Sequence, residues 1–260
     1  MVLFQTVWEF SYYEWGEAIS IVLWLTAIVS AIFALFLLSS YLNTRKPEHL
    51  YWGISFALIW LNTHISIFYT LIERTMIAGS FYMVQTRGTG FWTFLEAVPT
   101  TFFALAVGLF AVGLWKNVKP EKEKIGNYLL YYVIVMSLAI GIFKLENLNI
   151  VLGTEDIFIA PILVMALHIP SAILIIWLPL QTREENGKSA LAFPIAGVLM
   201  SLVGVLLAIA TLGILATDDY LFIVLAAFPF VYLLAVLGFA WGTIVPKRWN
   251  FAIPGIELED

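Results

Sequence analysis

Residues 102–140, FFALAVGLFAVGLWKNVKPEKEKIGNYLLYYVIVMSLAI, decide the fold class, because a short basic segment separates two long apolar runs. A helical apolar run of about 20 residues matches the roughly 30 Å hydrocarbon core of a bilayer. The segment between the runs carries Lys116, Lys119, Lys122 and Lys124. Basic connections of this kind are typical of the cytoplasmic side of a membrane. The stretch therefore predicts two membrane-spanning helices joined on that side.

The composition of the whole chain agrees with a membrane protein. Of its 260 residues, 62% are hydrophobic and only 12% are charged, and the mean hydropathy is +0.94. Domains that live in water are about 45–50% apolar and about 25% charged. We therefore expect a lipid bilayer to be the main surroundings of the chain. The net charge of -5 disfavours nucleic acid as a partner, and the absence of cysteine excludes disulfides and thiolate metal sites.

Seven apolar stretches bounded by charges, Gly or Pro are long enough to cross a bilayer as helices. They are residues 17–42, 51–73, 91–115, 126–146, 158–181, 190–216 and 220–245. The predicted fold class is an all-α integral membrane protein with a bundle of seven transmembrane helices. This seven-helix transmembrane domain covers residues 17–246. Residues 1–16 are predicted to form an extracytoplasmic N-terminal segment and residues 247–260 a cytoplasmic tail.

The distribution of Lys and Arg predicts the orientation of the bundle. Ten of the thirteen basic residues fall in the connections on one side, and only Arg74, Arg87 and Lys144 fall on the other side or at membrane depth near it. Because basic connections stay in the cytoplasm, we expect the N-terminus outside and the C-terminus in the cytoplasm. The predicted location is the cell (plasma) membrane, with multiple passes.

Tryptophans and one histidine mark the predicted inner ends of the helices. Trp52, Trp115 and Trp177 lie near these ends, where we expect their rings at the membrane interface. His49 belongs to the basic connection TRKPEHL, so we expect it to be solvated or at the level of the headgroups.

Small residues and prolines inside the predicted spans affect how the helices pack and bend. Ala104 with Gly108, and Gly197 with Ser201, provide small faces at helical spacing that let two helices approach closely. A proline inside a helix removes one backbone hydrogen bond and can bend the helix. Three prolines lie inside predicted spans: Pro99, Pro170 and Pro229.

Ionisable residues at membrane depth are costly and often mark function. Counting about 1.5 Å per residue places His64 and His168 near one level, slightly outside the midplane. Glu96 and Lys144 share a second level nearer the outside, where they are expected to form an intramembrane ion pair, and Arg74 lies farther out.

One functional hypothesis is a membrane anchor that carries electrons through a b-type haem. Two neutral imidazoles at equal depth on different helices are the minimum needed to bind a haem iron from both faces. His64 and His168 would be the metal ligands, and Lys144 and Arg74 would pair with the haem propionates. The chain would then pass electrons to a partner enzyme and do no bond chemistry itself.

An alternative hypothesis is a seven-helix sensor or receptor that acts through a partner. An outer polar pocket and helices interrupted by proline are what a ligand-responsive bundle needs. The stretches TRKPEHLYWGISFALIWL and FWTFLEAVPTTFFAL resemble the membrane input region of seven-helix sensor kinases. That resemblance implies a cytoplasmic partner that carries the output. A third hypothesis is transport or proton conduction through a relay of His64, Glu96, Lys144 and His168.

Two other classes of function find little support. The sequence has no self-contained catalytic motif such as HExxH or GxSxG, so the chain is not expected to be an enzyme by itself. Microbial rhodopsins attach retinal to a lysine of the last helix, and residues 220–245 contain no lysine. We therefore expect no covalently bound retinal.

Overall fold

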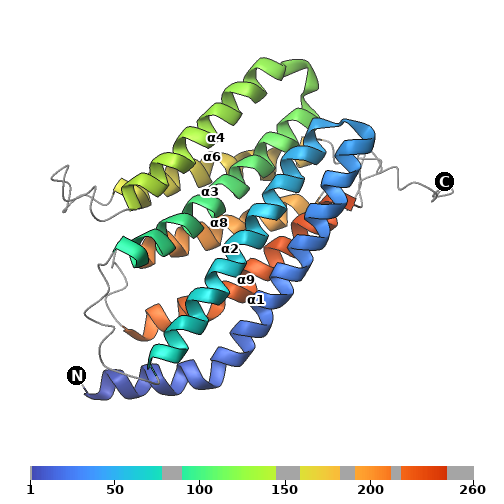
Figure 1. Cartoon of the computed structure of the whole chain (residues 1–260). Coiled ribbons are helices and arrows are strands. Elements are labelled where there is room, and N and C mark those ends of the chain that lie inside the picture. Colours follow the sequence, from blue (N-terminus) through green and yellow to red (C-terminus); the bar gives the residue numbers. More distant parts are fainter. Residues whose placement is uncertain (1, 78–89, 145–158, 182–190, 212–217, 245–260) are drawn as a thin grey trace.

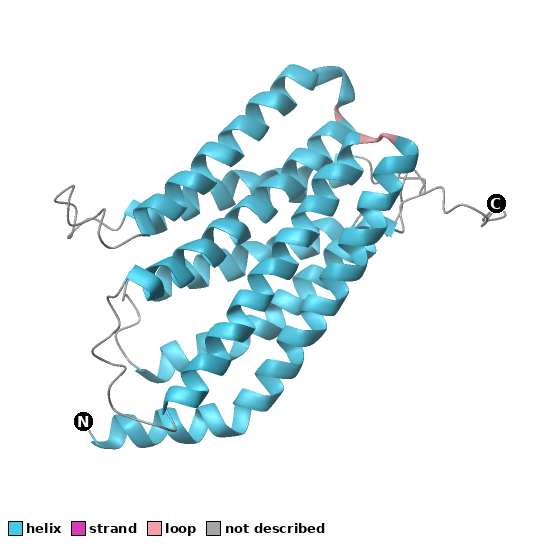
Figure 2. Ribbon diagram, viewed as in Figure 1, coloured by secondary structure: helices cyan, strands magenta, loops and turns pink. Residues whose placement is uncertain are grey.

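The computed structural model describes residues 2–77, 90–144, 159–181, 191–211 and 218–244. This part of the chain consists of seven α-helices and one short 3-10 turn, and it contains no β-strand (Figure 2). The helices are α1 (Val2–Thr44), α2 (Pro47–Ile77), α3 (Gly90–Val118), α4 (Glu123–Lys144), α6 (Ile159–Gln181), α8 (Ala192–Thr211) and α9 (Asp218–Ile244). The 3-10 turn η2 (Pro120–Lys122) joins α3 to α4.

Each α-helix lies on one of the seven apolar stretches that the sequence marks out. The main difference is at the N-terminus, where α1 begins at Val2, so residues 2–16 extend the first helix. Four segments of the described residues are long and apolar enough to cross a membrane. These segments are Ile21–Thr44, Ala97–Val118, Pro120–Phe143 and Ile162–Gln181.

Six helices, α1, α2, α3, α6, α8 and α9, form a ring, in which α3 has more contacts than any other helix (Figure 1). α3 packs against α2, α4 and α6, while α8 joins α6 to α9. α1 packs against both α2 and α9, so the first and the last helix close the ring. α4 lies outside the ring, in contact with α3 and α6.

Large aromatic side chains fill the centre of the ring. The rings of Phe110 and Phe239 are stacked with centroids 4.1 Å apart, which joins α3 to α9. Trp52 of α2 is fully buried beside them, its ring 5.7 Å from that of Phe193, and its indole nitrogen donates a hydrogen bond to the Phe110 carbonyl at 3.4 Å. Trp52 lies near the start of α2, as predicted, but its ring does not face the outside of the bundle. Its indole packs in the core, where the backbone of α3 satisfies its one donor.

Glycines allow the closest approaches between helices. A Cβ atom at Gly108 of α3 would collide with Val133 of α4, and one at Gly113 would collide with Trp52. At Gly197 of α8 a Cβ atom would lie 2.6 Å from Ile175 of α6. The expected packing role of Gly108 and Gly197 is thus confirmed.

The outward faces of the helices are apolar. Leu35 of α1 is 71% exposed, Val135 of α4 is 62% exposed, and Trp241 of α9 is 61% exposed. Large contiguous apolar surface is unfavourable in water and favourable in lipid. Together with the length of the helices, these faces support a membrane protein in contact with a bilayer.

Two turns lie at the same end of the bundle (Figure 1). At the first, Arg45 adopts a left-handed backbone conformation with φ 56°, a common way to end a helix, and Pro47 then starts α2. At the second, Pro120 follows α3 and opens η2. The N-terminal end of α1 lies at the opposite end of the bundle.

Candidate intramembrane polar site

A small polar cluster lies inside the bundle between α2 and α9. Asn62, Thr63 and Tyr232 are all buried. The amide nitrogen of Asn62 donates to the hydroxyl of Tyr232 at 3.2 Å, although the two residues are 170 positions apart in the chain. The hydroxyl of Thr63 donates to the carbonyl of Ile59, one turn earlier in α2, at 2.7 Å. The bond between Asn62 and Tyr232 joins α2 to α9 at this level.

An aromatic ring connects this cluster to a histidine of another helix. Phe103 of α3 lies with its centroid 5.7 Å from the ring of Tyr232. On its other side it stacks with His168 of α6, at 5.2 Å and an interplanar angle of 21°. Side chains from α2, α3, α6 and α9 therefore meet at one level of the bundle.

His168 is the least satisfied polar residue of this site. Its side chain is 2% exposed, and its Nδ1 lies 2.9 Å from the carbonyl oxygen of Val164. Because a carbonyl oxygen only accepts, Nδ1 carries the proton, which leaves Nε2 of the neutral ring as an acceptor. Nε2 is buried and has no hydrogen-bond partner among the described residues. Nε2 of His168 is therefore able to accept a hydrogen bond or to bind a metal ion.

His64 lies in a different environment. Its Nδ1 is 2.9 Å from the carbonyl oxygen of Trp60, and its ring makes edge contacts with Trp60 at 4.8 Å and with Trp24 of α1 at 5.6 Å. Two residues along a helix amount to a rotation of about 200°, so His64 and Asn62 point to opposite sides of α2. The described contacts therefore place His64 on the α1 side and His168 on the core side, without bringing the two together.

The remaining predicted site residues lie at or near helix ends. Arg74 belongs to α2, Glu96 to α3, and Lys144 is the last residue of α4. Their side chains lie outside the described residues. The ion pair between Glu96 and Lys144, and the role of Arg74 beside a haem propionate, stay predictions.

A second polar cluster lies at the end of the bundle, where α1 turns into α2. His49 is fully buried there, with Nδ1 3.0 Å from the hydroxyl of Ser40 and 3.1 Å from that of Thr44. The expectation that His49 is solvated is therefore wrong, because the turn folds its ring against the end of α1. Burial lowers the pKa of His49; the charge of Glu48 opposes this shift, and that of Lys46 adds to it.

A hydrogen bond links the two turns at this end. The side-chain nitrogen of Asn117, near the end of α3, donates to Oε1 of Glu48 at 3.2 Å. Glu48 is itself buried. The contact connects the start of α2 to the end of α3, so the two turns are held together by a polar bond as well as by helix packing.

The sequence reasoning singled out His64 and missed Asn62, Thr63 and Tyr232. For Asn62 and Thr63, a signal was present in the helical spacing of the residues of α2. In α2 the buried positions follow a helical stripe that comprises Trp52, Ser55, Phe56, Ile59, Asn62 and Thr63. Continuing this stripe of period 3.6 reaches Asn62 and passes by His64.

The described residues contain no group of three or more His, Cys, Asp or Glu side chains that could hold a metal ion. Comparison with family models, with curated proteins and with solved structures found no match to the chain.

Proposed function

We propose that the chain is a seven-span membrane protein, with its N-terminus outside, that acts as a sensor through a partner protein. The observation that carries this proposal is the buried polar site, in which four helices meet through Asn62, Tyr232, Phe103 and His168. Seven helices on seven predicted stretches support the span count. The basic residues of the α1–α2 and α3–α4 turns, which share one end, support the orientation.

Polar contacts inside a membrane bundle are few, so each one weighs on how the helices pack. An interhelical hydrogen bond between spans contributes about 0.6 kcal/mol on average and up to about 1.7 kcal/mol. A ligand that engages Nε2 of His168 or the Tyr232 hydroxyl in one arrangement only would shift the balance between two arrangements by its difference in affinity. A sensor needs this property.

Two prolines make the same helices easy to bend. Pro170 lies two residues after His168 in α6, and Pro229 lies three residues before Tyr232 in α9. Each proline removes one backbone hydrogen bond from its helix. His168 and Tyr232 of the polar site therefore lie close to positions where α6 and α9 are able to bend. Movement of their ends at the basic side would be the signal to a partner.

The test measures distances between spin labels in a chain that has no native cysteine. Labels at Lys122→Cys and Gln181→Cys report on the ends of α3 and α6. We expect Asn62→Leu and His168→Phe each to shift the population between two distances, because each removes a polar group of the site. His64→Phe, which alters the histidine on the other side of α2, serves as the control and should leave the distribution unchanged. A single identical distribution in all four proteins would contradict the proposal.

Haem binding is the second candidate, and one observation favours it. A histidine that binds a metal through Nε2 usually donates its Nδ1 hydrogen to a carbonyl or a carboxylate, and His168 has this arrangement with Val164. His64 contacts α1 instead, so a clamp of both histidines would require a different packing of α2. An absorption spectrum of protein supplemented with haem decides the matter. A Soret band that is lost in His168→Ala supports haem, and its absence from the wild-type protein excludes this candidate.

A further inference from the structure

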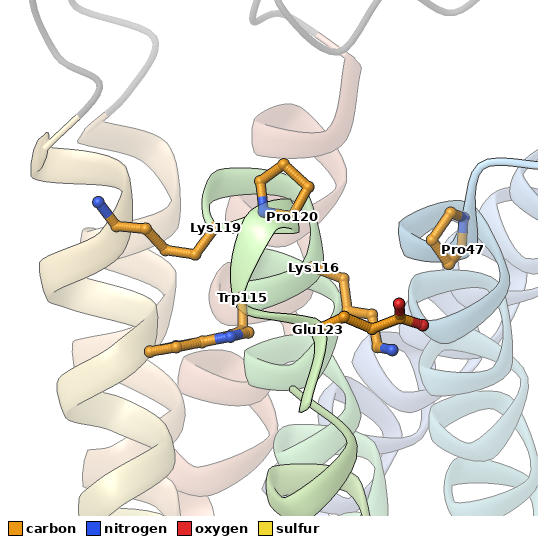
Figure 3. A pocket seen from close by; sticks show the side chains of 6 residues that line it. All are labelled: Pro47, Trp115, Lys116, Lys119, Pro120 and Glu123. Atoms are coloured by element: carbon orange, nitrogen blue, oxygen red, sulfur yellow. The ribbon is translucent and has the colours of Figure 1, made fainter. Parts of the chain in front are cut away.

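A small hollow lies beside the two turns at the basic end of the bundle. Its volume is about 130 Å³, and it opens at the junction of α2, α3 and α4. Six side chains line it: Pro47, Trp115, Lys116, Lys119, Pro120 and Glu123 (Figure 3). It is separate from the polar site, because none of these residues contributes to the contacts around Tyr232 and His168.

The walls of the hollow are held by defined contacts. The ammonium group of Lys116 donates to Oδ1 of Asn127 at 2.6 Å and lies 6.0 Å from the centre of the Tyr51 ring. The indole nitrogen of Trp115 donates to the carbonyl of Lys122 at 3.3 Å. In Figure 3, Lys119 extends on the same side of the turn as Trp115, and Lys116 and Glu123 extend toward Pro47. The side chains of Lys119 and Lys116 thus extend to opposite sides of the turn.

The electrostatic environment of the hollow is positive. The two turns carry six basic residues, namely Arg45, Lys46, Lys116, Lys119, Lys122 and Lys124. They carry three acidic residues, of which Glu48 is buried in a hydrogen bond with Asn117. A negatively charged group near this end therefore meets more positive than negative charge.

The position of the hollow points to the membrane as the source of that negative group. It lies at the end of the apolar segments Ala97–Val118 and Pro120–Phe143, which is where the headgroups of a bilayer would be. Tryptophan prefers this interfacial level, and basic pockets between membrane helices bind anionic headgroups. The volume suffices for a phosphate-sized group.

We propose that the hollow binds the headgroup of an anionic phospholipid. Lys116 contacts the phosphate on the side where it extends with Glu123, and Lys119 and Trp115 border the lipid from the other side of the turn. The carboxylate of Glu123 accepts hydrogen bonds from headgroup hydroxyls, which makes phosphatidylglycerol the suitable probe. This site depends on the helices being membrane spans and does not depend on the sensor function.

The experiment measures how many phosphatidylglycerol molecules the intact chain retains, by native mass spectrometry over a lipid titration. We expect tighter retention of phosphatidylglycerol than of phosphatidylcholine or phosphatidylethanolamine. Lys116→Gln and Lys119→Gln should each weaken the apparent affinity about fivefold, in keeping with the usual contribution of one basic residue near a membrane. The control is Lys124→Gln, which removes an exposed charge of the same turn that does not line the hollow.

Three outcomes would overturn the proposal. An equal loss of affinity in Lys124→Gln would mean that diffuse charge attracts the lipid. Equal retention of phosphatidylethanolamine would remove the preference for anionic headgroups. Displacement of the lipid by millimolar inorganic phosphate would identify a site for free phosphate. The melting temperature of each variant confirms that it is folded, and a purely structural defect would lower that temperature without a preference among lipids.

Discussion

Asn62 and Tyr232 show at the scale of single residues how a polar pair specifies a membrane bundle. Their hydrogen bond joins the second helix to the last, at the level where α3 and α6 also meet. Little of this arrangement is visible in the sequence, where His64 is the more conspicuous residue. Which side chain points inward depends on the rotation of α2, and a polar residue inside an apolar run does not reveal that rotation by its identity.

The pair predicts a coupling that mutations can measure. Asn62→Leu should lower the free energy of unfolding by about 0.6 to 1.7 kcal/mol, because the bond across helices is lost. In a background of Tyr232→Phe the same change should cost less, since no hydroxyl remains to lose its partner. Unfolding in mixed micelles with increasing denaturing detergent provides the four free energies of the cycle. Strictly additive effects would show that the two side chains do not interact.

His49 predicts a dependence of stability on pH. Its pKa is lowered in the folded protein by burial, so the unfolded chain takes up the proton more readily as the pH falls below the ordinary value of about 6.5. Stability should therefore be full above that value and decrease as the pH falls from about 7 toward 5. Melting curves across this range, for the wild type and for His49→Gln, test the expectation.

The matched control for His49 is His64→Gln, which leaves the buried ring in place. We expect this variant to keep the decrease of melting temperature at low pH and His49→Gln to lose much of it. A decrease of the same size in both variants would assign the effect to other groups.

At the scale of helices, the sequence predicted the positions of the helices along the chain well. It predicted less well which of their side chains are buried. The apolar stretches 51–73, 91–115 and 158–181 each fall within a few residues of an observed helix, because length and apolarity alone mark a span. The sequence did not reveal that the side chains of Trp52 and His49 are buried, because both residues were assigned from their distance to a helix end. Whether such a residue faces lipid, water or the core is decided by neighbouring helices, which are distant in the sequence.

The turn between α1 and α2 contains a residue in an unfavourable conformation. Arg45 has φ 56°, and an L-residue in the left-handed region costs roughly 1–2 kcal/mol relative to glycine. Arg45→Gly should therefore raise stability by about 1 kcal/mol, after allowing for the greater freedom of glycine in the unfolded chain. Arg45→Ala removes the same charge and the same contact with the ring of Tyr41 but keeps the Cβ atom. A melting temperature that rises as much in Arg45→Ala as in Arg45→Gly would contradict this account.

At the scale of the whole molecule, the distribution of Lys and Arg predicts the orientation of the bundle. The connection between α3 and α4, which carries Lys116, Lys119, Lys122 and Lys124, is expected in the cytoplasm. A membrane-impermeant maleimide applied to intact cells should therefore label Gln85→Cys, in the predicted outer connection, without permeabilisation. Lys122→Cys should react only after the membrane is opened. The reverse labelling pattern would mean that the bundle has the opposite orientation in the membrane. Labelling of both positions in intact cells would contradict the span count.

The contact between α1 and α9 has a consequence for how the protein is made. Because α1 and α9 are neighbours, the ring stays open until α9 has been synthesised. Asn62 has no Tyr232 to bond to until the chain has grown by a further 170 residues. The contacts of α3 with α2 and α4 join neighbours in the chain and can form before the contact of α1 with α9.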